Sequence, residues 1–152
     1  MILKPLDHET LKQAIALKVS CWQEELAGKL THHLNTDEEY SFWLEWMQSA
    51  DKYGDTRTLL GYFDGDKLVG TIFASFAEVS DTEHAVEING LFVDALYRGQ
   101  YLSLKMLNNV LTAYANLGKK RVIIYSHKYA PSNAFYRKFG GKVIKKMDQL
   151  DG

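Results

Sequence analysis

The chain has 152 residues, of which 46% are hydrophobic and 24% charged, and its formal net charge at pH 7 is −1. This length predicts a single domain, residues 1–152, with a core of its own. The near-neutral charge argues against a nucleic-acid partner, and no apolar run reaches the roughly 18 residues of a membrane span. Because the first residues lack the basic start and the apolar core of a signal peptide, we expect a cytoplasmic protein.

The N-terminal part is predicted to form a short strand followed by two helices. The strand is expected at residues 1–6, and Asp7 can then cap a first helix. The apolar positions of that helix recur at helical spacing and are Leu11, Ile15, Val19, Trp22 and Leu26. After a loop at 28–35, Thr36 and Glu39 have the spacing of a capping box, which predicts a second helix from Asp37 to about Ser49.

Three strands and a long helix are predicted in the middle of the chain. Strands 56–63 and 67–76 flank the hairpin turn Asp64-Gly65-Asp66, and a polar turn at 78–83 leads to a third strand at 84–93. A helix is expected from Arg98 to Leu117, because its apolar residues share one face, and Gly118 is expected to end it.

The C-terminal part is predicted to contain a buried strand at 121–126, a helix that begins near Pro131 and stops at Gly140-Gly141, and a final strand at 142–147. The strand–helix–strand unit at 86–126 should be a right-handed parallel crossover, whereas the earlier hairpins make the other strands antiparallel. The predicted fold class is therefore α/β (α+β), with a mixed, mostly antiparallel sheet that has helices on both faces.

Two stretches carry the functional argument. In the first, a strand ending in Leu91-Phe92-Val93-Asp94 leads through Arg98-Gly99 into a helix. A helix that begins at the end of a strand presents unpaired N–H groups and a positive dipole end, which together suit a phosphate. The second stretch is Asn133-Ala134-Phe135-Tyr136-Arg137-Lys138-Phe139-Gly140-Gly141.

With this element order and these stretches, nearly the whole chain resembles the GNAT N-acetyltransferase superfamily. In that family the strand-to-helix turn carries Arg/Gln-x-x-Gly-x-Gly/Ala, whose amides hold the pyrophosphate of acetyl-coenzyme A. The matching run is Arg98-Gly99-Gln100-Tyr101-Leu102-Ser103. The family's Phe-Tyr-x-Lys/Arg-x-Gly signature is present from Phe135 to Gly140. Tyr101 stands where the family has a glycine, so we expect a helical conformation there with the ring turned away from the phosphates.

The resemblance implies an acetyl-CoA-dependent enzyme that transfers an acetyl group directly to a primary amine of a small-molecule or peptide acceptor. It also implies splayed parallel strands that admit the pantetheine arm, which would pair with the main chain of Leu91, Phe92 and Val93. The other implied cofactor contacts are residues 98–103 together with Asn133 and Arg137, and either Arg137 or Lys138 is expected near the ribose phosphate. Tyr136 is the implied general acid, with simple positioning of the sulfur as its alternative role.

Glu87 is the leading candidate for the general base, because several members of this family carry a glutamate in the same strand that acts through water. Its neighbours Val86 and Ile88 are apolar, so Glu87 should face the opposite side of the sheet. Asn89 should share that side unless a β-bulge changes the alternation. A solvated carboxylate on the strand surface is the alternative, and Glu83 and His84 are weaker candidates.

The remaining chemically notable residues have ordinary explanations. Cys21 is the single cysteine, which excludes an internal disulfide, and it is expected to be a packing residue far along the chain from the motifs. No metal is expected at the adjacent His32 and His33, whose side chains should point apart. The aromatic residues of the first two helices are expected to be mainly core, with the lining of an acceptor pocket as the alternative; they are Trp22, Tyr40, Trp43 and Trp46.

The chain after Phe139 has room for one strand, whereas members of this family usually end with two. We expect the resulting sheet edge to be closed either by pairing of 142–147 with 121–126 or by a second subunit in a homodimer. Because Tyr101 departs from the phosphate-binding motif, a GNAT-fold protein that binds acyl-CoA as a sensor or scaffold, without efficient catalysis, is the second functional interpretation.

Overall fold

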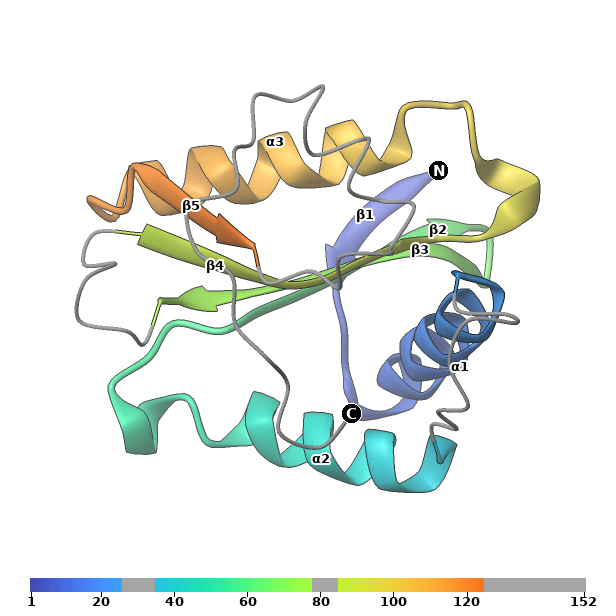
Figure 1. Cartoon of the computed structure of the whole chain (residues 1–152), viewed down its shortest axis with the longest axis horizontal. Helices are drawn as coiled ribbons and strands as arrows, with labels where there is room; N and C mark the ends of the chain where they lie inside the picture. The colour runs from blue at the N-terminus through green and yellow to red at the C-terminus, as the bar shows by residue number, and fades with distance from the viewer. Residues whose placement is uncertain (26–34, 78–84, 125–152) are drawn as a thin grey trace.

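A computed structural model describes residues 1–25, 35–77 and 85–124, and the structural statements below refer to these residues. They contain one five-stranded sheet in the order β1-β2-β3-β4-β5 (Figure 1). The strands are β1 (Ile2–Pro5), β2 (Thr58–Asp64), β3 (Lys67–Phe76), β4 (Ala85–Val93) and β5 (Arg121–Ile124). The α-helices are α1 (His8–Glu25), α2 (Thr36–Gln48) and α3 (Leu102–Ala115). The expected helix from Pro131 and the strand at 142–147 lie outside the described residues.

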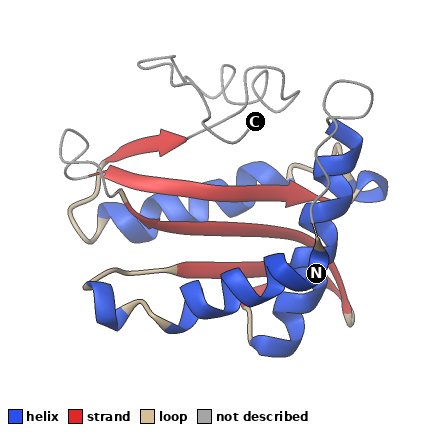
Figure 2. Cartoon of the chain, turned by 60° about the horizontal axis from the view of Figure 1, so that its bottom comes forward, coloured by secondary structure: helices blue, strands red, loops and turns tan. Residues whose placement is uncertain are grey.

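The pairing of the strands confirms the predicted fold class. β1 to β4 pair in antiparallel fashion, and β4 and β5 are parallel, with Ala85 opposite Arg121 and Ile88 opposite Ile124. α1 and α2 cover one face of the sheet and α3 covers the other (Figure 2). No helix within the described ranges is long and apolar enough to cross a membrane.

Each face of the sheet has its own apolar core. Under α3, the cluster includes Val86, Ile88 and Val93 of β4 packed against Met106, Leu107 and Val110 of the helix. Under α1, Leu11, Ile15 and Val19 pack against Phe63 and Phe73 of the sheet. Leu11, Ile15 and Val19 were all predicted to form the apolar face of the first helix.

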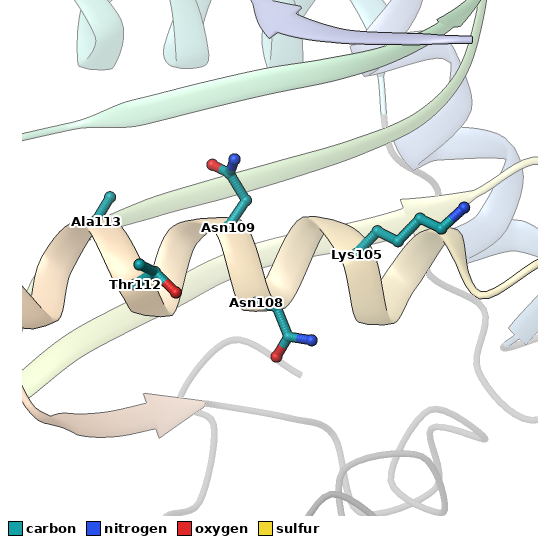
Figure 3. Close-up of a pocket in the computed structure, with 5 residues that line it drawn as sticks. All are labelled: Lys105, Asn108, Asn109, Thr112 and Ala113. Carbon is teal, nitrogen blue, oxygen red and sulfur yellow. The ribbon is translucent and has the colours of Figure 1, made fainter.

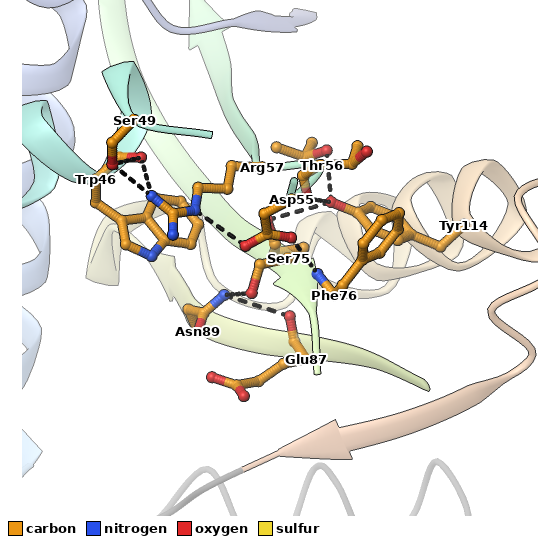
Figure 4. Close-up of polar contacts among 12 residues, drawn as sticks. Trp46, Ser49, Asp55, Thr56, Arg57, Ser75, Phe76, Glu87, Asn89 and Tyr114 are labelled. Atoms are coloured by element: carbon orange, nitrogen blue, oxygen red, sulfur yellow. Dashed lines mark hydrogen bonds and ion pairs between the residues drawn. The ribbon is translucent and has the colours of Figure 1, made fainter. Parts of the chain in front are cut away.

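Tyr114 ties α3 to three points of the sheet. Its ring is buried, and its hydroxyl lies 2.8 Å from the carbonyl oxygen of Thr56, 2.9 Å from Oγ1 of Thr58 and 3.2 Å from the carbonyl oxygen of Ala74 (Figure 4). Burial raises the pKa of this phenol above its ordinary value. These hydrogen bonds make the position of α3 specific, because the Tyr114 hydroxyl reaches all three partners only when the helix lies at one place on the sheet.

Two predicted helix starts are wrong. α2 is capped by Asn35 instead of Thr36, since Oδ1 of Asn35 accepts from the N–H of Glu38 at 3.1 Å. α3 begins at Leu102 instead of Arg98, because Ala95–Tyr97 form a separate 3-10 turn and Gly99 has a left-handed φ of 85°. The chain therefore changes direction between Arg98 and Leu102, which shapes the site described next.

Candidate functional site

The loop between β4 and α3 is fastened to its surroundings at several points. The N–H of Asp94 donates to the carbonyl of Val69 in β3 at 2.8 Å, and the Asp94 carboxylate accepts from the N–H of Leu96 at 2.9 Å. The hydroxyl of Tyr97 donates to Oδ2 of Asp64 in the β2–β3 hairpin at 2.8 Å. The start of α3 is therefore held in a defined position relative to the end of β4.

The first turn of α3 leaves its amides open. The helix has no side-chain cap, and Lys105 donates its N–H to the Tyr101 carbonyl at 3.0 Å in the first α-helical hydrogen bond of the helix. The N–H groups of Leu102, Ser103 and Leu104 precede that bond and lack a partner one turn back. At Gly99, an added Cβ would meet no atom within 4 Å. This end of the helix can therefore receive an anion.

Tyr101 has a left-handed backbone conformation, which a glycine adopts without strain. Its φ of 63° and ψ of 22° show that the expected helical conformation is wrong, although the residue is 74% exposed and its ring points away from the core. A left-handed conformation costs a residue with a Cβ atom about 1–2 kcal/mol. The open amides at the start of α3 are therefore not covered by a buried Tyr101 ring.

Tyr101→Gly should increase the free energy of unfolding by about 0.5–1 kcal/mol, because the relief of strain exceeds the added flexibility of the unfolded chain. Urea denaturation of the purified protein measures this difference. The matched control is Tyr101→Ala, which removes the ring but keeps the Cβ atom, and it should give no such gain. An equal gain in both variants would show that the ring, and not the backbone, is unfavourable.

Two residues at the end of β4 direct their main-chain groups toward the edge opposite β3. Asp94 donates its N–H to β3, and the backbone groups of an antiparallel strand alternate in direction. Phe92, opposite Thr71, therefore also faces β3, whereas Leu91 and Val93 face the other way. β5 pairs with β4 only from Ala85 to Ile88, so among the described residues no strand covers this edge of Leu91 and Val93.

β4 contains a β-bulge. Phe73 lies opposite Gly90 and Ala74 opposite Ile88, so Asn89 is an additional residue of β4. Ile88 lies opposite Ile124, the last residue of β5 that the structure describes, so the expected divergence of the two parallel strands is not tested by the described residues. Because a bulge bends its strand, β4 changes direction at Asn89.

Glu87 faces the α1–α2 side of the sheet, as expected. Val86 and Ile88 are buried under α3, and Glu87 lies opposite Ser75 of β3. The bulge keeps Asn89 on that same side, where its Nδ2 donates to Oγ of Ser75 at 3.0 Å and to the Glu87 carbonyl at 3.4 Å (Figure 4). The Glu87 side chain is partly exposed, which leaves it accessible to water.

Arg98 is directed toward α1. Its Nη1 and Nη2 contact the two carboxylate oxygens of Glu24, the second at 3.2 Å, and its Nε donates to the Val93 carbonyl at 3.3 Å. The hydrogen bond from Arg98 lowers the pKa of Glu24. Cys21 is buried as predicted, but its Sγ lies 3.8 Å from Nη2 of Arg98 and 3.7 Å from the Val93 carbonyl. Cys21 is therefore far from Arg98 along the chain but lies beside it in the folded protein.

The aromatic residues of α1 and α2 that were expected to be mainly core are partly buried, and three of them, Tyr40, Trp43 and Trp46, pack against the core under α1. The Trp43 ring centroid lies 5.0 Å from that of Phe73 in β3, and the Lys18 ammonium lies 5.8 Å from the Trp22 ring and 5.9 Å from the Trp43 ring. The indole Nε1 atoms of Trp22 and Trp43 are buried and have no hydrogen-bond partner among the described residues. Tyr40 donates its hydroxyl to the His8 carbonyl at 2.9 Å.

Sequence reasoning did not single out a buried ion pair beside the Glu87 strand. Arg57 contacts Asp55 at 3.0 Å and donates to the Trp46 carbonyl at 2.6 Å, while Asp55 accepts from the N–H of Phe76 at 3.0 Å (Figure 4). The sequence signal that could have indicated this ion pair is the Asp-x-Arg run Asp55-Thr56-Arg57 between the second helix and the next strand. These contacts join the end of α2 to the end of β3, which is a structural role.

A shallow hollow on the outer side of α3 is lined by Lys105, Asn108, Asn109, Thr112 and Ala113 (Figure 3). These five residues include no carboxylate, histidine or cysteine, so the hollow offers little acid–base chemistry. Within the described ranges there is also no cluster of three or more His, Cys, Asp or Glu side chains that could hold a metal ion. His32, His33, Glu83, His84, Asn133, Tyr136 and Arg137 lie outside the described residues.

The comparison with known protein families gives a single answer. Residues 19–141 match the acetyltransferase (GNAT) family. The chain belongs to this family. No curated protein sequence matches it closely enough to narrow the assignment further.

Solved GNAT structures share the fold at low sequence identity. A predicted acetyltransferase with acetyl-CoA from Clostridium acetobutylicum is 11% identical, with a TM-score of 0.75 over 99% of this chain and 95% of the other. A PaiA N-acetyltransferase from Thermoplasma acidophilum in complex with coenzyme A is 16% identical, with a TM-score of 0.73 over 97% and 92%. An aminoglycoside 6'-N-acetyltransferase from Acinetobacter haemolyticus is 15% identical, with a TM-score of 0.70 over 100% and 98%.

As a member of the GNAT family, this protein uses acetyl-CoA as its cosubstrate. The described residues fit such a molecule in two ways. The open amides of α3 suit its diphosphate, and the outward-facing main chain of Leu91, with the N–H of Val93, suits the amides of its pantetheine arm.

Proposed function

We propose that this GNAT protein transfers an acetyl group from acetyl-CoA directly to a primary amine of a small-molecule or peptide acceptor. The observation that carries the proposal is the N-terminus of α3, which has no side-chain cap, close behind the end of β4, whose outward edge no strand covers among the described residues. The first would serve as the phosphate site and the second as the docking edge for an extended arm.

The cofactor-binding residues then have distinct tasks. The amides of Leu102 and Ser103 face the diphosphate, helped by the dipole of α3 and by the Ser103 hydroxyl. Gly99, Gln100 and Tyr101 shape the turn that exposes these amides. The main chain of Leu91 and the N–H of Val93 pair with the pantetheine arm, while the Val93 carbonyl stays bonded to Arg98 and the Phe92 main chain to β3. Asn133 and Arg137 complete the proposed site from the second signature.

The catalytic proposal concerns Glu87 and Tyr136. Acetyl-CoA supplies an acetyl group activated as a thioester. The acceptor amine must be neutral to attack, so the Glu87 carboxylate takes its proton through a water molecule. A main-chain N–H at the β4 edge stabilises the negative charge that develops on the carbonyl oxygen. The Tyr136 hydroxyl donates a proton to the departing sulfur.

The proposed function is tested with purified protein, acetyl-CoA and a panel of amines that comprises polyamines, amino acids, aminoglycosides, and peptides with a free N-terminus or lysine. Release of the coenzyme A thiol that depends on one of these amines supports the transferase. A raised melting temperature with acetyl-CoA but no release with any amine points instead to the sensor or scaffold interpretation. No thermal shift with acetyl-CoA would contradict both.

Glu87→Gln and Tyr136→Phe are each expected to lower kcat about 100-fold, because each removes one proton-transfer group. The dissociation constant for acetyl-CoA should stay within about twofold, since neither side chain is assigned to binding. Steady-state kinetics and calorimetry provide the two measurements. Glu38→Gln is the control, because it removes an exposed carboxylate from the first turn of α2 and should leave kcat unchanged. An unchanged kcat in Glu87→Gln would remove Glu87 from the mechanism.

A further inference from the structure

The guanidinium of Arg98 is already engaged on the α1 side of the loop. Nε donates to the Val93 carbonyl, Nη1 and Nη2 form a forked pair with Glu24, and Nη2 also lies 3.8 Å from Sγ of Cys21. Every nitrogen of the guanidinium therefore has a protein partner. None of these partners lies in α3, whose first turn holds the open amides.

The contacts of Arg98 connect three elements around the proposed cofactor site. Glu24 lies in the last turn of α1, Val93 ends β4, and Arg98 leads into Gly99 and Tyr101, which both have left-handed φ angles. The Val93 carbonyl that Arg98 binds lies on the outward edge of β4, beside the groups of Leu91. Arg98 thus links the end of α1 to the end of β4 at the point where the chain leaves the strand.

We infer that Arg98 is a positioning residue that ties α1 to the end of β4 and thereby orients the amides of α3, instead of a direct phosphate ligand. The inference rests on the proposed cofactor site and revises the role that the family resemblance implies for Arg98. The planar guanidinium of arginine fits this role, because it can donate to the Val93 carbonyl and to both carboxylate oxygens of Glu24 at the same time. The ammonium of a lysine is a single point charge and cannot reproduce this arrangement. Preorganised donors bind more tightly because they lose less freedom on binding.

Glu24→Gln distinguishes the two roles by the direction of its effect on affinity. If Arg98 positions the loop, the weakened fork should raise the dissociation constant for coenzyme A about two- to fivefold, the size expected for one exposed ion pair. If Arg98 is a phosphate ligand held back by Glu24, the same change releases it, and coenzyme A should bind more tightly. Isothermal titration of the full chain with coenzyme A measures this, and an unchanged or lower dissociation constant overturns the inference.

Glu9→Gln is the matched control, because it removes the same charge from the exposed first turn of α1. It should leave the affinity for coenzyme A unchanged. An effect equal to that of Glu24→Gln would show that the net charge of α1, and not the fork, controls binding, and would also overturn the inference.

Arg98→Lys and Arg98→Gln form the second arm. A positioning role predicts that both weaken coenzyme A binding to a similar extent, since neither side chain reproduces the fork. A phosphate ligand predicts that lysine preserves most of the affinity. Thermal denaturation without ligand verifies that each variant is folded, and in the active enzyme the KM for acetyl-CoA should rise while kcat at saturation stays the same. If the wild type binds coenzyme A but acetylates no amine, the transferase proposal fails while these binding tests still decide the role of Arg98.

Discussion

Ser103→Asp is expected to weaken acetyl-CoA binding at least about 100-fold, because like charges brought together in a binding site cost several kcal/mol. Ser103 is the second residue of α3 and is partly exposed beside the open amides. The new carboxylate would occupy the positive end of the helix and repel the diphosphate. The same carboxylate should stabilise the free protein by about 0.3–1 kcal/mol through the helix dipole.

The expected result is specific because the affinity for acetyl-CoA should fall while the free energy of unfolding rises. Calorimetry measures the affinity and urea denaturation measures the free energy of unfolding. Ser103→Asn tests the shape of the side chain without the charge, and Asn108→Asp places the same charge on an exposed position further along α3. Retention of full affinity in Ser103→Asp would mean that the diphosphate does not lie at the start of α3.

Tyr114→Ala is expected to lower the free energy of unfolding by about 3–5 kcal/mol, the range for removing a large buried aromatic side chain. Tyr114→Phe should lower it by about 1–3 kcal/mol, because the polar groups of Thr56 and Thr58 lose a buried partner. Urea denaturation at neutral pH measures both. Tyr53→Phe removes a hydroxyl from an exposed ring and should have almost no effect.

The Tyr114 hydroxyl also adds a pH dependence. Burial raises the pKa of this phenol above its ordinary value of 10.0, so the folded state keeps a proton that the unfolded state releases. As the pH rises above 10, this difference in bound protons lowers the free energy of unfolding until the folded phenol ionises too. Tyr114→Phe should therefore lose stability less steeply than the wild type between pH 9 and pH 11, measured by urea denaturation at several pH values.

Local residue spacing predicted each described α-helix and β-strand, because helical and strand periodicity show within a few residues, but it did not predict the 3-10 turns Asp51–Tyr53 and Ala95–Tyr97. It was less successful at the helix starts. Asn35 and Thr36 are both good N-cap residues, so the pattern does not separate adjacent candidates. The start of α3 was predicted too early because left-handed backbone at Gly99 and Tyr101 leaves no trace in the apolar spacing.

The candidate site was predictable in its motifs but not in its long-range contacts. Glu87 lies on the expected face of the sheet, since strand alternation determines it. Glu24 and Cys21 of α1 were not expected to meet Arg98, because contacts between elements far apart in the chain depend on packing, which no local pattern contains. The orientation of the main chain at Leu91 and Val93 depends on the register with β3, which the sequence does not specify.

The additional residue at Asn89 reverses which alternate residues of β4 point toward α3. Before it, the even-numbered Val86 and Ile88 lie in the core beneath α3, whereas after it the odd-numbered Leu91 and Val93 contact that same core. Glu87 and Leu91 would share a face in a regular strand, but the shift in phase sends the acid to one side and the leucine to the other. One inserted amino acid thus places the proposed general base and the leucine side chain of the proposed docking edge on opposite faces of the sheet.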